Sequence, residues 1–277
     1  MDAEWENIGQ IMEDVHGMDV SMYDANFLQH AIEKRCESVR IPWDAGYRSY
    51  LAQSSDEAKQ LMESLTITYT VFFRNVLTYA HLEQWILPGL IERKSGAGEL
   101  RIWSAGCSTG QEAYSIAMLM ETLTGKKACE VPYRIIATDI SEPALAAAER
   151  GVYTMESMEN VRTGDAGRYF VKTGDRYMVH DRLKKHVSFS YYNLLDDLSS
   201  YPQESIFGNF DLVVCCNVLY YYQPVYQHFI LKKLMGAMTE KGYLITGEAE
   251  RHIAAESGGL RSVAPPSPIF RKYEVQR

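Results

Sequence analysis

The stretch Arg101–Met120, RIWSAGCSTGQEAYSIAMLM, constrains the fold more than any other part of the chain. It opens with apolar residues that suit a buried strand, turns between Gly106 and Gly110, and continues with apolar residues at helical spacing. Glycines let the backbone pass close to a ligand, and the first N–H groups of the following helix can donate to it. This order predicts a nucleotide-binding corner of an α/β sheet, with a tight turn that binds no ligand as the alternative.

Two acidic residues near this turn favour one class of ligand. Asp139 ends a second predicted strand, Tyr133–Thr138, where proteins commonly bind the hydroxyls of a ribose. Glu112 follows the turn, and its charge would repel a diphosphate but suit a cationic nucleoside. This charge and the Gly-x-x-x-Gly spacing disfavour a Rossmann dehydrogenase. S-adenosylmethionine carries a sulfonium, an ammonium and a ribose but no phosphate, so it fits as the cofactor.

Composition predicts a soluble, cytoplasmic, globular protein. Hydrophobic residues make up 46% of the chain, which is ample for a core, and the N-terminus is acidic. We find no run of about 18 apolar residues and no signal peptide, so we expect no membrane insertion. The net charge of -8 originates in residues 1–65, with 13 acids against 5 bases, which argues against a nucleic-acid partner. Five cysteines without Cys-x-x-Cys spacing predict neither a disulfide framework nor a metal site.

Residues 1–65 are predicted to form a small helical domain. Apolar residues recur at helical spacing in three stretches, and Ser54 or Ser55 could cap a fourth helix. Basic residues gather near Lys34 and Arg35. Two interpretations of them stay open: solvated helix faces, or a strip that contacts an acidic helix.

Residues 66–80 are predicted to link the helical domain to the rest of the chain. This segment is rich in hydroxyl side chains and includes two phenylalanines followed by Arg74. It could be a buried strand or loop with Arg74 at the surface. Alternatively, Thr68, Thr70 and Arg74 could lie over the ligand.

Residues 81–277 are predicted to form one α/β domain with a parallel sheet, because strand and helix patterns alternate. Core strands are expected at 101–105, 133–138, 210–216 and 243–247. The segment 165–190 alternates instead, so we predict an inserted antiparallel β-subdomain that includes Val187 and Phe189. The proline-rich tail is predicted to end in a last edge strand.

The strand 210–216 ends in polar and aromatic residues at the edge where α/β sheets bind ligands. Cys216 and Asn217 stand at this end, and Tyr220, Tyr221 and Tyr222 follow. Three consecutive tyrosines cannot all face one ligand, so core packing is expected for at least one of them.

Six stretches in chain order resemble motifs of the chemotaxis receptor methyltransferases, the CheR family. They are TVFFR from Thr70, GCSTGQEAYS from Gly106, ATDI from Ala137, GVY from Gly151, NLL from Asn193 and CCNVLYY from Cys215. The family forms are T-x-FFR, GCSTGEEPYS, ATDID, GVY, NLL and CRNVLIY. The resemblance runs from about residue 66 to 250, and the N-terminal helices suit the family's helical domain.

The resemblance implies a class I S-adenosylmethionine-dependent methyltransferase fold that transfers methyl groups to glutamate side chains of chemoreceptors, leaving S-adenosyl-L-homocysteine. It implies methyl transfer beside Arg74 and Tyr221. It implies receptor methylation helices as partner, with a receptor tail peptide on the β-subdomain as in some members of the family, and we expect a monomer. The cofactor-binding residues that it implies are Thr68, Thr70, Arg74, Gly106, Glu112, Asp139, Asn193, Leu194, Cys215, Cys216 and Asn217.

Three positions depart from the family pattern. Cys216 replaces the arginine of CRN, Glu248-Ala249 replaces the His-Ser of GHSE, and Thr68 replaces an asparagine. Two alternatives therefore stay open beside receptor methylation. The chain could methylate a small molecule, or it could bind the cofactor as a regulator without turnover.

Overall fold

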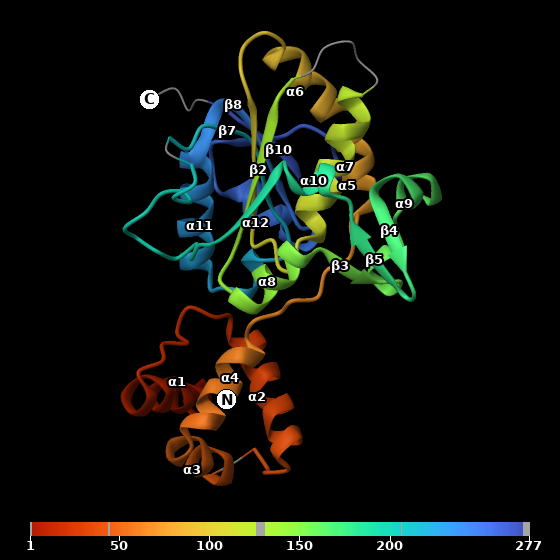
Figure 1. The fold of residues 1–277 in the computed structure, drawn as a ribbon. Coiled ribbons are helices and arrows are strands. Elements are labelled where there is room, and N and C mark those ends of the chain that lie inside the picture. Colours follow the sequence, from red (N-terminus) through yellow and green to blue (C-terminus); the bar gives the residue numbers. More distant parts are fainter. Residues whose placement is uncertain (1, 44, 126–130, 206, 274–277) are drawn as a thin grey trace. The chain divides into compact units, whose positions relative to one another are not determined.

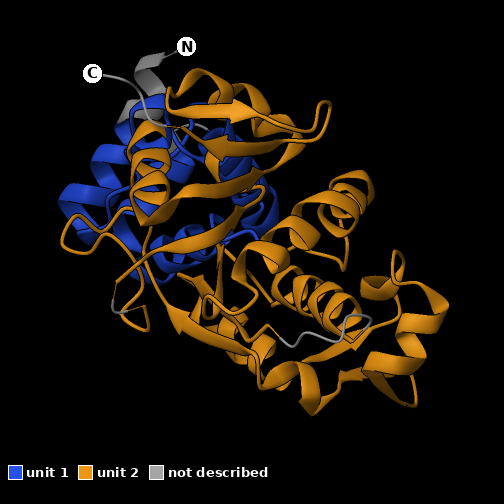
Figure 2. Ribbon diagram, turned by 90° about the horizontal axis from the view of Figure 1, so that it is seen from above, with its two compact units in different colours: residues 1–67, 220–227 blue, residues 68–219, 228–277 orange. Residues whose placement is uncertain are grey.

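The computed structural model describes residues 2–43, 45–125, 131–205 and 207–273. The chain divides into two compact units (Figure 2). The first comprises Met1–Ile67 and Tyr220–Gln227, and the second comprises Thr68–Leu219 and His228–Arg277. Within the described residues, every helix is too short or too polar to cross a bilayer.

The first unit is built from the helices α1 (Asp2–His16), α2 (Ala25–Val39), α3 (Ala45–Gln53) and α4 (Ser55–Ser64) (Figure 1). Ser54 caps α4 by accepting a hydrogen bond from the N–H of Glu57, which confirms one of the two predicted caps. The later segment Tyr220–Gln227 pairs with the chain just before α2, since Asp24 N donates to Tyr221 O at 2.8 Å.

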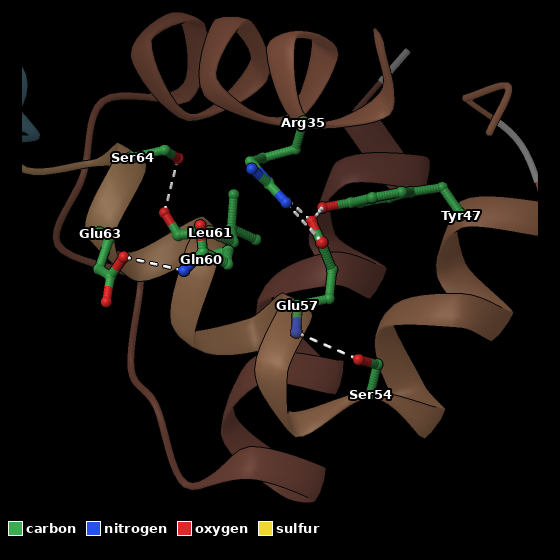
Figure 3. Close-up of polar contacts among 8 residues, drawn as sticks. All are labelled: Arg35, Tyr47, Ser54, Glu57, Gln60, Leu61, Glu63 and Ser64. Atoms are coloured by element: carbon green, nitrogen blue, oxygen red, sulfur yellow. Dashed lines mark hydrogen bonds and ion pairs between the residues drawn. The ribbon is translucent and has the colours of Figure 1, made fainter. Parts of the chain in front are cut away.

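A buried carboxylate holds three of these helices together (Figure 3). Glu57 on α4 is 2% exposed and receives two bonds from the Arg35 guanidinium on α2, at 2.9 and 2.7 Å. The hydroxyl of Tyr47 on α3 donates to the same carboxylate at 2.9 Å. Arg35 is therefore engaged inside the helical unit, whereas its neighbour Lys34 is exposed.

Replacing Arg35 by alanine should lower the free energy of unfolding by about 3 kcal/mol, because Glu57 would stay buried without its cation. The matched control is Lys34→Ala, which removes a neighbouring exposed cation and should change stability by less than about 0.5 kcal/mol. Urea unfolding followed by circular dichroism measures both. Equal stability of the two variants would contradict the structural role of the Arg35–Glu57 pair.

The second unit contains a seven-stranded sheet in the order β6-β2-β1-β7-β8-β10-β9. The first five strands in this order are parallel, and β10 runs antiparallel to both of its neighbours. The strands are β1 (Leu100–Ala105), β2 (Tyr133–Asp139), β6 (Val187–Tyr191), β7 (Phe210–Cys215), β8 (Met238–Thr246), β9 (Leu260–Ser262) and β10 (Ile269–Lys272).

Helices that connect these strands contribute to the hydrophobic core of the second unit (Figure 1). In α7, every residue from Ala113 to Met120 is buried, which explains why this stretch is mostly apolar. The helical elements are α5 (Val76–His81), a π-helical turn (Leu82–Ile86), α6 (Leu87–Lys94), α7 (Gln111–Thr124), α8 (Glu142–Arg150), α9 (Thr163–Tyr169), α10 (Asp181–Lys184), α11 (Pro224–Ala237) and α12 (Arg251–Glu256).

The four predicted core strands are confirmed, but the predicted last edge strand was wrong. β10 lies between β8 and β9, and β9 forms that edge of the sheet. Ile269 and Phe270 of β10 are fully buried, which suits an inner strand. β9 spans only Leu260–Ser262, too short to give an alternating pattern.

A second, three-stranded antiparallel sheet has the order β3-β5-β4. It consists of β3 (Val152–Thr154), β4 (Phe170–Thr173) and β5 (Arg176–Val179), with the predicted turn at Gly174. The prediction that Val187 and Phe189 belong to this sheet was wrong. They lie in β6, which pairs in parallel with β2. Alternation identified β4, β5 and β6 as strands but could not identify their partners, and β3 lies outside the predicted segment 165–190.

Candidate functional site

The turn after β1 requires its two glycines. Gly106 and Gly110 have φ values of 77° and 92°, a conformation that costs other residues free energy. A Cβ atom on Gly106 would lie 2.5 Å from the Val218 side chain, and one on Gly110 would lie 2.8 Å from the Ala148 Cβ. The turn is held to β2 because Gly106 N donates to Thr138 O at 2.8 Å. This turn therefore brings backbone closely past the ends of β2 and β7.

Asp139 at the end of β2 faces this turn. Its Oδ2 accepts from the Ser108 N–H at 2.8 Å, and its Oδ1 accepts from the Ser141 N–H at 2.9 Å. Burial raises the pKa of the Asp139 carboxyl, and these two N–H groups oppose that rise. A hydrogen bond from Tyr192 N to Asp139 O, 3.1 Å long, places the end of β6 beside it.

The residues directly after β6 lie at the same edge of the sheet as Asp139. Asn193 is partly exposed, and its side-chain oxygen accepts from the Leu195 N–H at 2.9 Å. Leu194 is 6% exposed, so its side chain packs within the unit. These two predicted cofactor residues therefore follow the strand that neighbours Asp139.

Glu112 lies in the first turn of α7, between the ends of β1 and β7. Its Oε1 accepts from the Ser104 Oγ at 2.7 Å, and the thiol of Cys216 forms a further hydrogen bond with its carboxyl group. Burial raises its pKa to about 7, Glu250 adds to the rise, and Arg74 opposes it. A cation bound beside Glu112 would favour its ionised form.

The linker is tied to the glycine turn through its backbone. Thr68 O accepts from the Ser108 Oγ at 2.9 Å, and Thr70 O accepts from the Gln111 Nε2 at 3.2 Å. The Thr68 side chain is exposed and that of Thr70 is partly exposed. The segment is therefore anchored to the glycine turn, and the position of Thr68, Thr70 and Arg74 over the ligand stays a prediction.

Arg74 is set at the surface by the two phenylalanines before it. Phe72 is fully buried, and Phe73 has a φ of 51° while its N–H donates to the Ser115 Oγ at 3.0 Å. The exposed Arg74 side chain donates to Tyr69 O at 3.3 Å and lies 5.5 Å from the centre of the Tyr69 ring. Its guanidinium is therefore accessible, and its positive charge opposes the rise in the pKa of Glu112.

At the end of β7, the two adjacent cysteines differ in environment. Cys215 is fully buried, and burial raises the pKa of its thiol, as expected for an inert core cysteine. Cys216 is partly exposed and is joined to Glu112. Asn217 follows with a φ of 61°. Among the predicted residues, Thr68, Thr70, Gly106, Glu112, Asp139 and Cys216 are thus joined around one turn.

Tyr221 belongs to the first unit, whereas Arg74 belongs to the second. The Tyr221 ring lies 4.7 Å from that of Phe27, and its hydroxyl is 2.9 Å from that of Tyr220. Tyr222 is 9% exposed and stacks on Tyr23, which confirms that at least one tyrosine of this run packs in a core. A shared role of Arg74 and Tyr221 in methyl transfer stays a prediction.

Sequence reasoning missed Ser108 and Glu250. Ser108 joins the linker to Asp139, and its position inside the glycine turn was the available signal. Glu250 accepts hydrogen bonds from three N–H groups, among them those of Asn217 and Leu219. The signal for Glu250 was its place as the final glutamate of the GHSE-like segment, after the two altered positions Glu248 and Ala249.

Residues 68–260 match the family model described as CheR methyltransferase, SAM binding domain. The chain belongs to the CheR methyltransferase family. It is therefore an S-adenosylmethionine-dependent methyltransferase of mixed α/β fold.

Curated relatives cover most of the chain. It is 30% identical to the chemotaxis protein methyltransferase of Listeria monocytogenes, over 89% of each chain. It is 34% identical to chemotaxis protein methyltransferase 1 of Pseudomonas aeruginosa, over 69% of each chain. Identity to the chemotaxis protein methyltransferase of Escherichia coli is 29%, over 90% of this chain and 84% of that protein.

The residues around the glycine turn fit S-adenosylmethionine. Asp139 can accept hydrogen bonds from ribose hydroxyls, and Glu112 offers a carboxyl group for a cationic part of the cofactor. The backbone passes closely at Gly106 without a second glycine pair to hold a diphosphate. These two carboxyl groups suit a nucleoside that carries positive charge and no phosphate.

In the ligand-free protein, Glu112→Gln should be more stable than the wild type at pH 8.5. The folded-state pKa of about 7 lies above the ordinary 4.5, so protonated Glu112 stabilises the fold fully below pH 4.5. That contribution is lost as pH rises through 7, and glutamine keeps the neutral form. We expect a gain of about 3 kcal/mol at pH 8.5 and less than about 1 kcal/mol at pH 5.

Urea unfolding at the two pH values measures this difference. Glu99→Gln removes an exposed carboxylate outside this site, so it controls for the loss of a carboxylate and should change stability by less than about 0.5 kcal/mol. If Glu112→Gln has the same free energy of unfolding as the wild type at both pH values, the raised pKa of Glu112 in the folded protein would be contradicted.

Proposed function

We propose that this methyltransferase transfers the methyl group of S-adenosylmethionine to glutamate side chains of chemoreceptors and forms glutamate methyl esters. The names of its curated relatives support a role in chemotaxis. The structural observation that carries the proposal is the anchored linker, which is bound to the glycine turn and carries the exposed Arg74, whose charge acts on Glu112.

The reaction needs alignment more than acid–base chemistry. A glutamate carboxylate has a pKa of about 4.3 and is already ionised near neutral pH, so no general base is required. S-adenosylmethionine, when bound, supplies an activated methyl group. Arg74 orients the acceptor carboxylate or that of the cofactor, and Tyr221 packs near the methyl group. Exclusion of water from the acceptor carboxylate keeps it reactive.

The proposed cofactor site uses side chains and backbone from four strand ends. Asp139 binds the ribose hydroxyls, and Glu112 binds the ammonium group. Cys215 is fully buried, so it contributes through its backbone. The remaining proposed contacts come from Thr68, Thr70, Arg74, Gly106, Asn193, Leu194, Cys216 and Asn217.

The proposed partner is the cytoplasmic methylation helices of a receptor, whose carboxylates would attract exposed cations on α2. Lys34 fits this role, but Arg35 is bound to Glu57. We propose that the enzyme acts in the cytoplasm as a monomer and needs no nucleic acid.

A receptor tail peptide would suit the small sheet. The paired residues Val152, Met178 and Val171 form an apolar row across its three strands and are 44, 42 and 44% exposed. A peptide strand along one edge of this sheet could cover the row with its own apolar side chains.

A cofactor-binding regulator without turnover is the second candidate. It is favoured by one observation, the Cys216 thiol bound to Glu112 where the family has an arginine. Cofactor binding does not distinguish the two functions, whereas transfer of a methyl group does.

Incubation with methyl-labelled S-adenosylmethionine and receptor cytoplasmic fragments should place base-labile label on the receptor. Base lability identifies a carboxylate methyl ester. Arg74→Ala should reduce the rate at least about tenfold, because the acceptor loses its orienting cation. Intact cofactor binding without label would favour the regulator, and transfer to a small molecule alone would favour the other alternative. An Arg74→Ala enzyme with the wild-type rate would exclude the role of Arg74.

Asp139→Ala should weaken binding of S-adenosylmethionine by about tenfold to a hundredfold, because it removes the acceptor for the ribose hydroxyls. Calorimetric titration measures the dissociation constant. Asp175→Ala is the control, since Asp175 lies in the hairpin turn of the small sheet with its side chain 90% exposed. Unchanged affinity of the Asp139 variant would refute the ribose assignment.

A further inference from the structure

Glu250 is a fully buried carboxylate beside the end of β7. Its Oε2 accepts from the N–H groups of Gly247 at 2.6 Å and Asn217 at 2.9 Å. Its Oε1 accepts from the Leu219 N–H at 2.7 Å. The Glu250 side chain thus accepts hydrogen bonds from backbone N–H groups of two segments, the one after β8 and the one after β7.

These bonds need a carboxylate. An ionised carboxyl group only accepts hydrogen bonds, and each of its two oxygens faces at least one N–H group here. Glutamine would turn an NH2 group toward one of these donors and lose that bond. Bonds from N–H to an ionised acceptor are also stronger than neutral ones. Glu250 is therefore matched to this backbone in shape and in charge.

The segment that Glu250 holds is the one that borders the cofactor site. Asn217 has a φ of 61°, a left-handed conformation that asparagine adopts more readily than most other residues that carry a Cβ atom. Cys216, directly before it, is joined to Glu112. Val218, directly after it, lies against Gly106, where a Cβ atom would come within 2.5 Å.

We propose that Glu250 is a positioning residue of the cofactor site. It fixes the backbone of residues 217–219 in the conformation that S-adenosylmethionine binds, so that Cys216 meets Glu112 and Val218 meets the glycine turn. Because Glu250 is fully buried, it acts through this segment and not through contact with the cofactor. The inference concerns cofactor binding and holds whichever carboxylate receives the methyl group.

The test compares wild-type protein with Glu250→Gln in two measurements that need no receptor. Hydrogen exchange of the ligand-free protein should become faster in peptides that cover residues 217–219. Calorimetric titration with S-adenosylmethionine should give a dissociation constant raised at least about tenfold, because the competent conformation is populated less often.

Asp211→Asn is the matched control at the other end of β7. Asp211 is 5% exposed, accepts from the Arg101 N–H at 3.0 Å and pairs with Lys94 at 2.9 Å. Its loss should lower thermal stability but leave the dissociation constant within about twofold, as expected for a change outside the site. An equal loss of affinity in both variants would overturn the proposal, because general destabilisation would then explain it.

Glu250→Asp keeps the charge but shortens the side chain, and it serves if the glutamine variant does not fold. It should show the same two effects to a smaller extent. A folded Glu250 variant with wild-type exchange at residues 217–219 and wild-type affinity would refute the positioning role. Failure of both variants to fold, with Asp211→Asn folded, would assign Glu250 to stability and also overturn the proposal.

Discussion

The hydrogen bond from the Ser108 N–H to the Asp139 carboxylate is the interaction on which the proposed cofactor site depends. It fixes the glycine turn against the second strand, while the Ser108 hydroxyl binds the linker at Thr68. One residue thereby orders three segments that lie far apart in sequence. The bond also fixes the position of the Asp139 side chain. Its second carboxylate oxygen accepts a hydrogen bond from the Ser141 N–H. A site assembled in this way is preorganised before the cofactor arrives.

Two buried carboxyl groups beside the end of β7, those of Glu250 and Glu112, have different hydrogen-bond partners. Glu250 receives three N–H groups, and this suits the ionised form. Glu112 receives hydroxyl and thiol groups, and burial raises its pKa to about 7. The negative charge of Glu250 also raises the pKa of Glu112, because it opposes ionisation of that carboxyl group. Cys216, which stands where the family motif has an arginine, forms a hydrogen bond with Glu112, and the positive charge of Arg74 favours ionisation of Glu112.

The sequence predicted those parts of the fold that depend on local pattern. The strands around Ile102, Ile135, Val213 and Leu244 were found because long apolar runs mark buried parallel strands. The glycine turn, Asp139 and Glu112 were found because their chemistry follows from residue type and order. Strand partners were not predictable in the same way, so Phe189 was given to the wrong sheet. Glu250 was missed because its role arises only when the chain folds it back onto Asn217.

Because the segment Tyr220–Gln227 belongs to the helical unit, dividing the chain at one position cannot separate the two units. The chain leaves the helical unit after Ile67 and returns to it for these eight residues before it resumes the α/β unit. A fragment that lacks residues 1–67 would lose Tyr23 and Phe27, against which Tyr222 and Tyr221 pack. Exchange of helical domains between relatives must therefore transplant both pieces of sequence together. Such a discontinuous unit also constrains evolution, because changes at the N-terminus and in the Tyr220–Gln227 segment must remain compatible.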